Sequence, residues 1–172
     1  MASLLENLIE VLDSECTAYE KLIGLAESKT PAIIAGNIEE LGKITEDEQK
    51  IVGTIQGMEK QRNKFLADIA NVVNRDVTTL KLIDLIQMLE KMPDQKDLLA
   101  GVQKRLRATI DKLKAVNDKN QMLLADKLEM VDFNLNMIRA TKSAPQTANY
   151  SKDAYTNGQV LGIFHGGFDA KQ

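Results

Sequence analysis

Side chains that could catalyse a reaction or bind a metal are scarce in this chain, and their spacing does not favour either task. The 172 residues include one cysteine, Cys16, and one histidine, His165. A zinc site built on one histidine and one cysteine would need several carboxylates nearby, and no acidic cluster has that spacing. Acidic pairs such as Glu39-Glu40 and Asp47-Glu48 are typical of helix surfaces and helix caps. No metal site is therefore predicted.

The glycine-rich segment 162–167 is the other candidate for chemistry. Its sequence, Gly-Ile-Phe-His-Gly-Gly, neither follows a predicted strand nor opens a predicted helix, so it does not resemble a phosphate-binding loop. The chain also has no Walker-A loop, no calcium loop and no nucleophile elbow. The sequence predicts that the protein is not an enzyme and has no cofactor.

Residues that could bind another protein gather in the last periodic segment. A row of apolar residues at every seventh position, Leu99, Leu106 and Leu113, continues as Asn120, Lys127 and Asn134. Buried asparagines can fix helix register, and the same positions can form a mixed polar and apolar groove for a partner helix. Both interpretations stay open. On the second, the candidate binding residues are Asn117, Asn120, Leu123, Leu124, Met130, Val131 and Leu135.

The tail after residue 140 is the second candidate binding element. It has no helical period, yet it contains Tyr150 and Tyr155 of three tyrosines and Phe164 and Phe168 of four phenylalanines. A segment that stays disordered is usually poor in aromatic residues. The tail is therefore expected to dock onto a partner, and its apolar run 160–164 could also fold back on the helices.

Two long helices are expected before residue 74. Apolar residues spaced by three and four, beginning at Leu5, predict a helix with one buried face, which includes Cys16 as a core residue. Pro31 should kink or end this helix, and Gly36-Asn37 should end it. Asn37 should then cap a second helix over 38–73, whose apolar residues repeat every seven positions.

A short helix and a third long one should follow. Thr78 or Thr79 is expected to cap the short helix, and Met92-Pro93 to stop it. Asp94 is expected to cap the last helix, which continues to about residue 139. The predicted fold is all-α: an antiparallel up-and-down bundle of three long helices and one short helix, coiled-coil-like, over residues 1–140, with a flexible non-helical tail over 141–172.

Composition narrows the possible partners and surroundings. The net charge of −3, with mixed signs, gives no reason to expect nucleic acid. No apolar run reaches the roughly 20 residues of a membrane span, so membrane insertion is not expected. The first residues lack the basic start of a signal peptide, and one cysteine excludes an intramolecular disulfide framework. These features predict a cytoplasmic protein.

Three segments together resemble the FlgN family of flagellar export chaperones. Residues 117–124, Asn-Asp-Lys-Asn-Gln-Met-Leu-Leu, resemble the N-x-x-N-x-x-L-L segment of that family's last helix. Residues 155–159, Tyr-Thr-Asn-Gly-Gln, are similar to its short tyrosine-to-glycine motif after the bundle, and 35–41 is similar to its helical corner. The likeness covers essentially the whole chain in length and element order.

The resemblance implies a cytosolic bacterial chaperone of type III flagellar export. It would bind the helical termini of hook-associated (hook–filament junction) proteins, prevent their aggregation and deliver them to the membrane export gate. Tyr155, with Gly158, matches the tyrosine that the family links to docking on the cytoplasmic part of that gate. Tyr155 is one residue closer to Gly158 than in the commonest pattern, so Tyr150 is the alternative.

A structural protein is the competing interpretation of the same periodicity. Long helices with heptad repeats also form coiled-coil scaffolds that self-assemble and have no client. A weak homo-oligomer is compatible with either function. Oligomeric state and client binding would separate the two.

Overall fold

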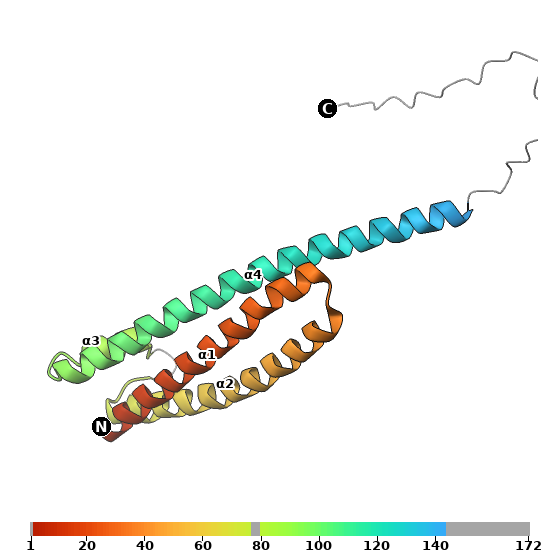
Figure 1. The fold of residues 1–172 in the computed structure, drawn as a ribbon. Coiled ribbons are helices and arrows are strands. Elements are labelled where there is room, and N and C mark those ends of the chain that lie inside the picture. The colour runs from red at the N-terminus through yellow and green to blue at the C-terminus, as the bar shows by residue number, and fades with distance from the viewer. Residues whose placement is uncertain (1, 77–79, 144–172) are drawn as a thin grey trace, which may run out of the picture. The chain divides into compact units, whose positions relative to one another are not determined.

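Four helices make up the described part of the chain. The computed structural model describes residues 2–76 and 80–143. The helices are α1 (Ala2–Ala35), α2 (Ile38–Val72), α3 (Leu82–Met88) and α4 (Pro93–Ser143), and no strand occurs within these two ranges (Figure 1). The all-α fold of three long helices and one short helix is confirmed.

The corner between α1 and α2 is built from two residues with special roles. Gly36 has a φ of +69°, a left-handed conformation that glycine adopts without steric cost. Asn37 is the N-cap of α2: its Oδ1 accepts a hydrogen bond from the Glu40 backbone N at 3.1 Å. Its amide also donates to Glu40 Oε2 at 3.0 Å. This tight corner makes α1 and α2 antiparallel.

Pro31, which was predicted to kink or end this helix, does not end it, because α1 continues through it to Ala35. Proline removes the hydrogen bond from position 31 to the carbonyl of Glu27. Both Pro31 and Glu27 are exposed, so water can satisfy that carbonyl on the outer side of the helix. The next residues, Ala32 and Ile33, are buried, and their burial favours continuing the helix.

Two predicted caps are also corrected. Lys81, not Thr78 or Thr79, is the N-cap of α3, and its backbone N donates to Asp84 Oδ2 at 3.0 Å. In α4, Pro93 is the first helical residue, so Asp94 lies in the first turn instead of capping it. Proline suits a first helical position because the amide missing there has no partner within the helix.

The core lies along the faces that α1, α2 and α4 turn toward one another. Its largest cluster joins residues of all four helices, and α3 contributes Leu85 with the adjoining Leu89. Cys16 is fully buried within this cluster, as predicted for a core residue. The buried members of the cluster are Leu5, Leu8, Leu12, Cys16, Ile69, Leu85, Leu89, Leu99 and Leu106.

A second, smaller cluster lies nearer the α1–α2 corner. It consists of Ala18 and Leu22 from α1 and Ile55 from α2, with Leu113 of α4 packed against it. Residues of α3 are absent from this cluster. The bundle therefore has four helices at one end and only three along the rest of its length.

The chain divides into two compact units, Met1–Phe133 and Asn134–Gln172. The first contains all of the core described above. The described residues of the second are the end of α4, and from 134 to 142 each of them is exposed.

Candidate functional site

The candidate site lies where α4 changes from a buried to an exposed helix. The row of α4 residues at every seventh position begins in the core, where Leu99 is fully buried and Leu106 is only 6% exposed. Leu113 is half-buried, Asn120 is buried and Lys127 is half-buried. From Leu128 to residue 142 every residue is exposed. Asn120 is thus the last fully packed position of α4.

Asn120 attaches α4 to α1 through both ends of its amide. Its Nδ2 donates to the carbonyl oxygen of Ala26 at 2.6 Å. Its Oδ1 accepts from Thr30 Oγ1, also at 2.6 Å. A buried amide satisfied on both sides fixes the register of two helices without the cost of an unpaired polar group. For this residue the geometry favours the register interpretation over direct contact with a partner.

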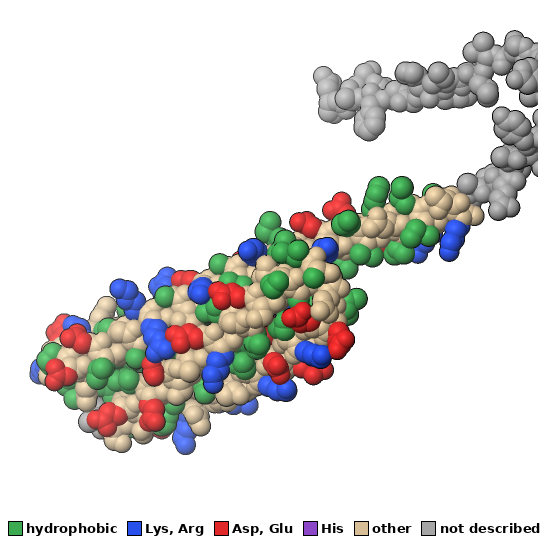
Figure 2. Space-filling view, viewed as in Figure 1, with side chains coloured by type: hydrophobic (Ala, Val, Ile, Leu, Met, Phe, Trp, Pro, Cys, Tyr) green, Lys and Arg blue, Asp and Glu red, His purple; other side chains and the backbone are tan. Residues whose placement is uncertain are grey.

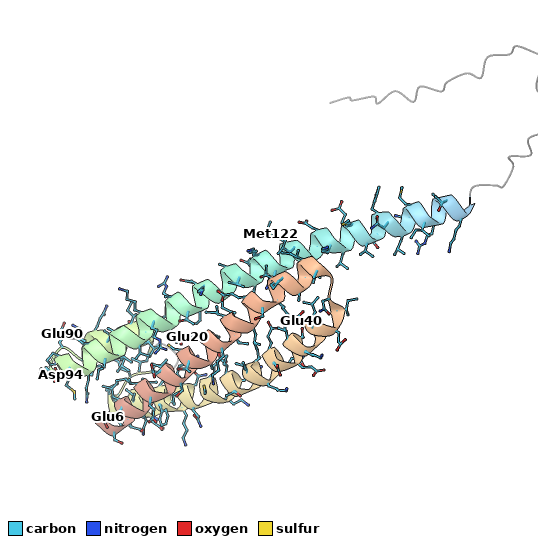
Figure 3. All side chains as sticks on the ribbon, in the orientation of Figure 1. Glu6, Glu20, Glu40, Glu90, Asp94 and Met122 are labelled. Atoms are coloured by element: carbon cyan, nitrogen blue, oxygen red, sulfur yellow. The ribbon has the colours of Figure 1, made fainter. Side chains whose placement is uncertain are left out.

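Beyond Asn120, two apolar rows lie on the surface of α4. The inner row continues from the side of Asn120 and consists of Leu124, Leu128 and Val131, which are 44%, 58% and 50% exposed. The outer row consists of Met122, Met130 and Phe133, which are 70%, 58% and 62% exposed. Figure 2 shows hydrophobic side chains on this part of α4, and Figure 3 shows Met122 on the side away from α1.

The inner row begins at a groove enclosed by three helices, which we call the corner groove. It has a volume of about 650 Å³ and is lined by α1, α2 and α4. An ion pair between Lys29 of α1 and Glu48 of α2 lies on its wall. Most of the other lining side chains are apolar: Tyr19, Leu22, Ile33, Leu41, Val52, Leu113 and Leu124.

One residue of the outer row, Met130, lines a smaller groove, which we call the side groove. It has a volume of about 270 Å³ and lies between the end of α1 and α4. Ile33 and Ile34 line it from α1, and Leu123, Asp126, Lys127 and Met130 line it from α4. Ile33 of α1 borders both grooves, but the two share no residue of α4.

The residues predicted for client binding fall into three groups. Asn117 and Leu124, together with the buried Asn120, line the corner groove. Leu123 and Met130 line the side groove. Val131 and Leu135 are exposed and line neither groove. Tyr150, Tyr155 and Gly158, predicted for the export gate, lie outside the described residues.

The site predicted from the sequence left out three of the exposed apolar residues of α4 between positions 122 and 133. They are Met122, Leu128 and Phe133. Leu128 could have been found, because it lies four residues after Leu124 and three before Val131, the spacing of one helix face. Phe133 could have been found in the same way, three residues after Met130.

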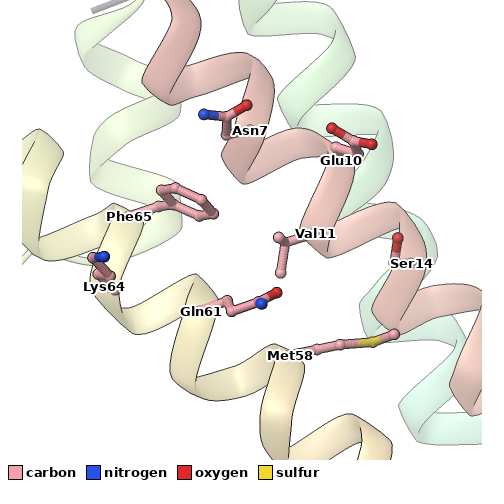
Figure 4. Close-up of a pocket in the computed structure, with 8 residues that line it drawn as sticks. All are labelled: Asn7, Glu10, Val11, Ser14, Met58, Gln61, Lys64 and Phe65. Atoms are coloured by element: carbon pink, nitrogen blue, oxygen red, sulfur yellow. The ribbon is translucent and has the colours of Figure 1, made fainter.

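A different groove, between α1 and α2, has a mixed polar and apolar lining. Figure 4 shows Asn7, Glu10, Val11 and Ser14 of α1 facing Met58, Gln61, Lys64 and Phe65 of α2 across it. Its side chains mix both charges with amides and apolar groups. No feature of this groove selects a particular ligand.

One carboxylate lies buried in the bundle, at the residue that follows Ser14 of this groove. Glu15 is fully buried, and its Oε2 accepts from Arg62 Nη1 at 2.6 Å. Among the residues that the structure describes, its Oε1 has no hydrogen-bond partner. Burial raises the pKa of Glu15, and Arg62 opposes that rise. The pair holds α1 against α2.

The Cys16 side chain is a buried thiol, as predicted for a core residue. Burial raises the pKa of the Cys16 thiol, which favours its unreactive form. Within residues 2–76 and 80–143, no three His, Cys, Asp or Glu side chains are placed to bind a metal ion. None of the described helices is both long and apolar enough to cross a membrane.

These features place the chain in the class of all-α helical-bundle proteins with a long, partly exposed last helix. The chain belongs to the FlgN family: the sequence profile described as "FlgN protein" matches residues 1–158. The general role of this family is flagellar export chaperoning, and it is a family of chaperones, not of enzymes.

A relative in Bacillus subtilis (strain 168) carries the name "Uncharacterized protein YvyG". It is 27% identical over 145 residues, which cover 84% of this chain and 85% of the relative. No solved structure matches the chain.

Proposed function

We propose that this protein binds the helical termini of flagellar hook–filament junction proteins in the cytoplasm. It would prevent their premature aggregation and deliver them to the type III export apparatus. The observation that carries this proposal is the exposed apolar surface of α4 between Met122 and Phe133. An apolar surface of this kind on a helix is typical of partner binding, because exposure to water costs free energy that a partner can recover.

The physical need for such a chaperone follows from the chemistry of its clients. Helices that pair only in the assembled filament junction have exposed apolar faces before assembly. A helix-in-groove complex would cover those faces with the apolar surface of α4 and the adjoining grooves. The proposed contact residues are Asn117, Leu123, Leu124, Met130, Val131 and Leu135, with Asn120 positioning α4.

The tail is proposed to address the complex to the membrane. On this proposal residues 1–140 hold the client and residues 141–172, through Tyr155 with Gly158, dock on the cytoplasmic part of the export gate. Tyr155→Ala should leave client binding unchanged but reduce secretion of the client in cells. Normal secretion by this variant would transfer the docking role to Tyr150, and Tyr150→Ala should then show the defect.

The direct test of the proposed function is client binding. Purified protein is mixed with each hook–filament junction protein encoded in the same genome, and complex formation is measured by pull-down. Aggregation of the client is measured by light scattering with and without the protein. We expect a stoichiometric complex and less client aggregation. A chain that binds none of these proteins and instead forms elongated multimers would be a coiled-coil scaffold, and the proposal would be wrong.

A further inference from the structure

The exposed part of α4 is apolar on two nearly opposite faces. At about 100° per residue, the centres of the inner row (Leu124, Leu128, Val131) and the outer row (Met122, Met130, Phe133) lie roughly 190° apart around the helix. A helix in contact with one partner helix needs only one apolar stripe. A helix that is apolar on opposite faces is suited to burial on both sides.

Each row also adjoins a different groove. Leu124 of the inner row lines the corner groove, and Met130 of the outer row lines the side groove. The two grooves use different residues of α4, whose centres lie roughly 115° apart around the helix at about 100° per residue, so one straight helix is not expected to occupy both. Each of the two rows therefore continues from its own groove along the exposed part of α4.

The charges beside the rows indicate the chemistry of the occupant. Between positions 122 and 133, α4 has three acidic residues, Asp126, Glu129 and Asp132, and one basic residue, Lys127. At about 100° per residue, Asp126 lies within the outer row between Met122 and Met130, Glu129 borders the outer row beside Met122, and Asp132 borders the inner row beside Leu128. A second copy of this segment would bring like charges together, whereas a helix with Lys or Arg beside its apolar stripe would be attracted.

We propose that α4 is clasped by two amphipathic helical segments of one client, one along each row. This inference rests on the proposed function and specifies it. One segment occupies the corner groove and the inner row, and the other occupies the side groove and the outer row. Both have basic residues beside their apolar stripes, facing Glu129 and Asp132.

Row-specific variants test this arrangement. The inner variant is Leu128→Ser with Val131→Ser, and the outer variant is Met130→Ser with Phe133→Ser. All four side chains are at least half exposed, so both variants should keep the circular dichroism spectrum and melting temperature of the wild type. The matched control is Ile38→Ser with Ile83→Ser, which removes two exposed apolar side chains from α2 and α3.

Affinity for the full-length junction protein is then measured by calorimetry. We expect the inner and outer variants each to weaken binding about tenfold or more, as loss of buried anchor residues usually does, and the control to bind like wild type. If the inner variant weakens binding and the outer variant does not, the two-sided clasp is wrong while the chaperone function stands. If the wild type binds no junction protein, the proposed function itself fails.

A second measurement locates the two segments directly. A photoreactive phenylalanine analogue is placed at Leu128 or at Phe133, and the cross-linked client peptides are identified by mass spectrometry. We expect the two positions to give peptides from different helical segments of one client. Cross-links from Phe133 only to a second copy of this chain would make the outer row a self-association surface and would overturn the proposal.

Discussion

Between Pro93 and Asn120, α4 packs its leucines into the bundle, where Leu99 and Leu106 are buried beside residues of α1. Between Met122 and Phe133 the same helix exposes leucine, methionine, valine and phenylalanine to solvent. The two regions have similar apolar spacing and differ in what surrounds them. In the first region α1, α2 and α3 supply the partners, whereas in the second the end of α1, through Ile33 and Ile34, lies beside Leu123 and Met130. An apolar repeat therefore predicts a buried face but does not indicate which molecule buries it.

The largest expected effect comes from removing the same side chain from each region. Leu99→Ala should lower the free energy of unfolding by about 2–5 kcal/mol, because it leaves a cavity in a fully packed site. Leu128→Ala should change it by less than about 0.5 kcal/mol, because that side chain is mostly in water. Urea unfolding followed by circular dichroism measures both. Similar losses for the two variants would show that the exposed region is buried in solution, and the comparison would fail.

A smaller loss is expected at the boundary between the two regions. Asn120→Ala leaves the Ala26 carbonyl and the Thr30 hydroxyl without their partner, which should cost about 1–3 kcal/mol of stability. Asn117→Ala is the matched control, and it should have little effect because Asn117 is exposed. The same urea experiment compares the two. Equal stability of both variants would mean that Asn120 does not anchor α4.

The sequence was most informative where local chemistry decides the structure. Gly36 and Asn37 specify the corner through a left-handed φ and a side-chain cap, and both were predicted from residue type alone. Apolar residues spaced by three and four, and by seven, predicted the three long helices, because helical periodicity is also a local property of the sequence. Pro31 does not end α1, because burial of Ala32 and Ile33, which depends on tertiary packing, favours continuing the helix.

The candidate site was less predictable from the sequence. Asn120 and Asn117 look alike in sequence, yet only Asn120 meets Ala26 and Thr30, more than 85 positions earlier in the chain. Likewise, the leucines before and after Asn120 have similar spacing, and the buried ones differ from the exposed ones in how many residues of the other helices pack around them. Contacts between distant segments carry this information, so residue spacing alone could not supply it.

The buried Glu15 gives a pH-dependent contrast between the core and the exposed region. Its raised pKa, caused first by burial, means that the folded state binds the proton more tightly than the unfolded state does. Stability from this group is therefore greatest below its ordinary pKa and is lost as pH rises through the raised value. Arg62 reduces the effect.

Glu15→Gln should remove this dependence, since glutamine does not titrate. As pH rises from acidic to neutral, the wild type should lose stability relative to the variant, in urea titrations at matched pH values. Glu46→Gln, at an exposed position of α2, is the control and should show no such trend. A wild type that gains stability relative to Glu15→Gln over this range would show that Arg62 outweighs burial and lowers the pKa.

The smallest effect is expected at the exposed ion pairs that join α4 to α1 in its buried region. Arg105 donates to Asp13 Oδ1 at 2.6 Å and to both carboxylate oxygens of Glu20, which lies on α1 in Figure 3. All three side chains are about half exposed, so water and salt weaken their attraction. Arg105→Gln should lower stability less than Asn120→Ala does, and the loss should shrink as salt is raised. These ion pairs lie where apolar packing already holds α4 in place. A large, salt-independent loss of stability would therefore mean that charge, more than the buried leucines, fixes α4 to the bundle.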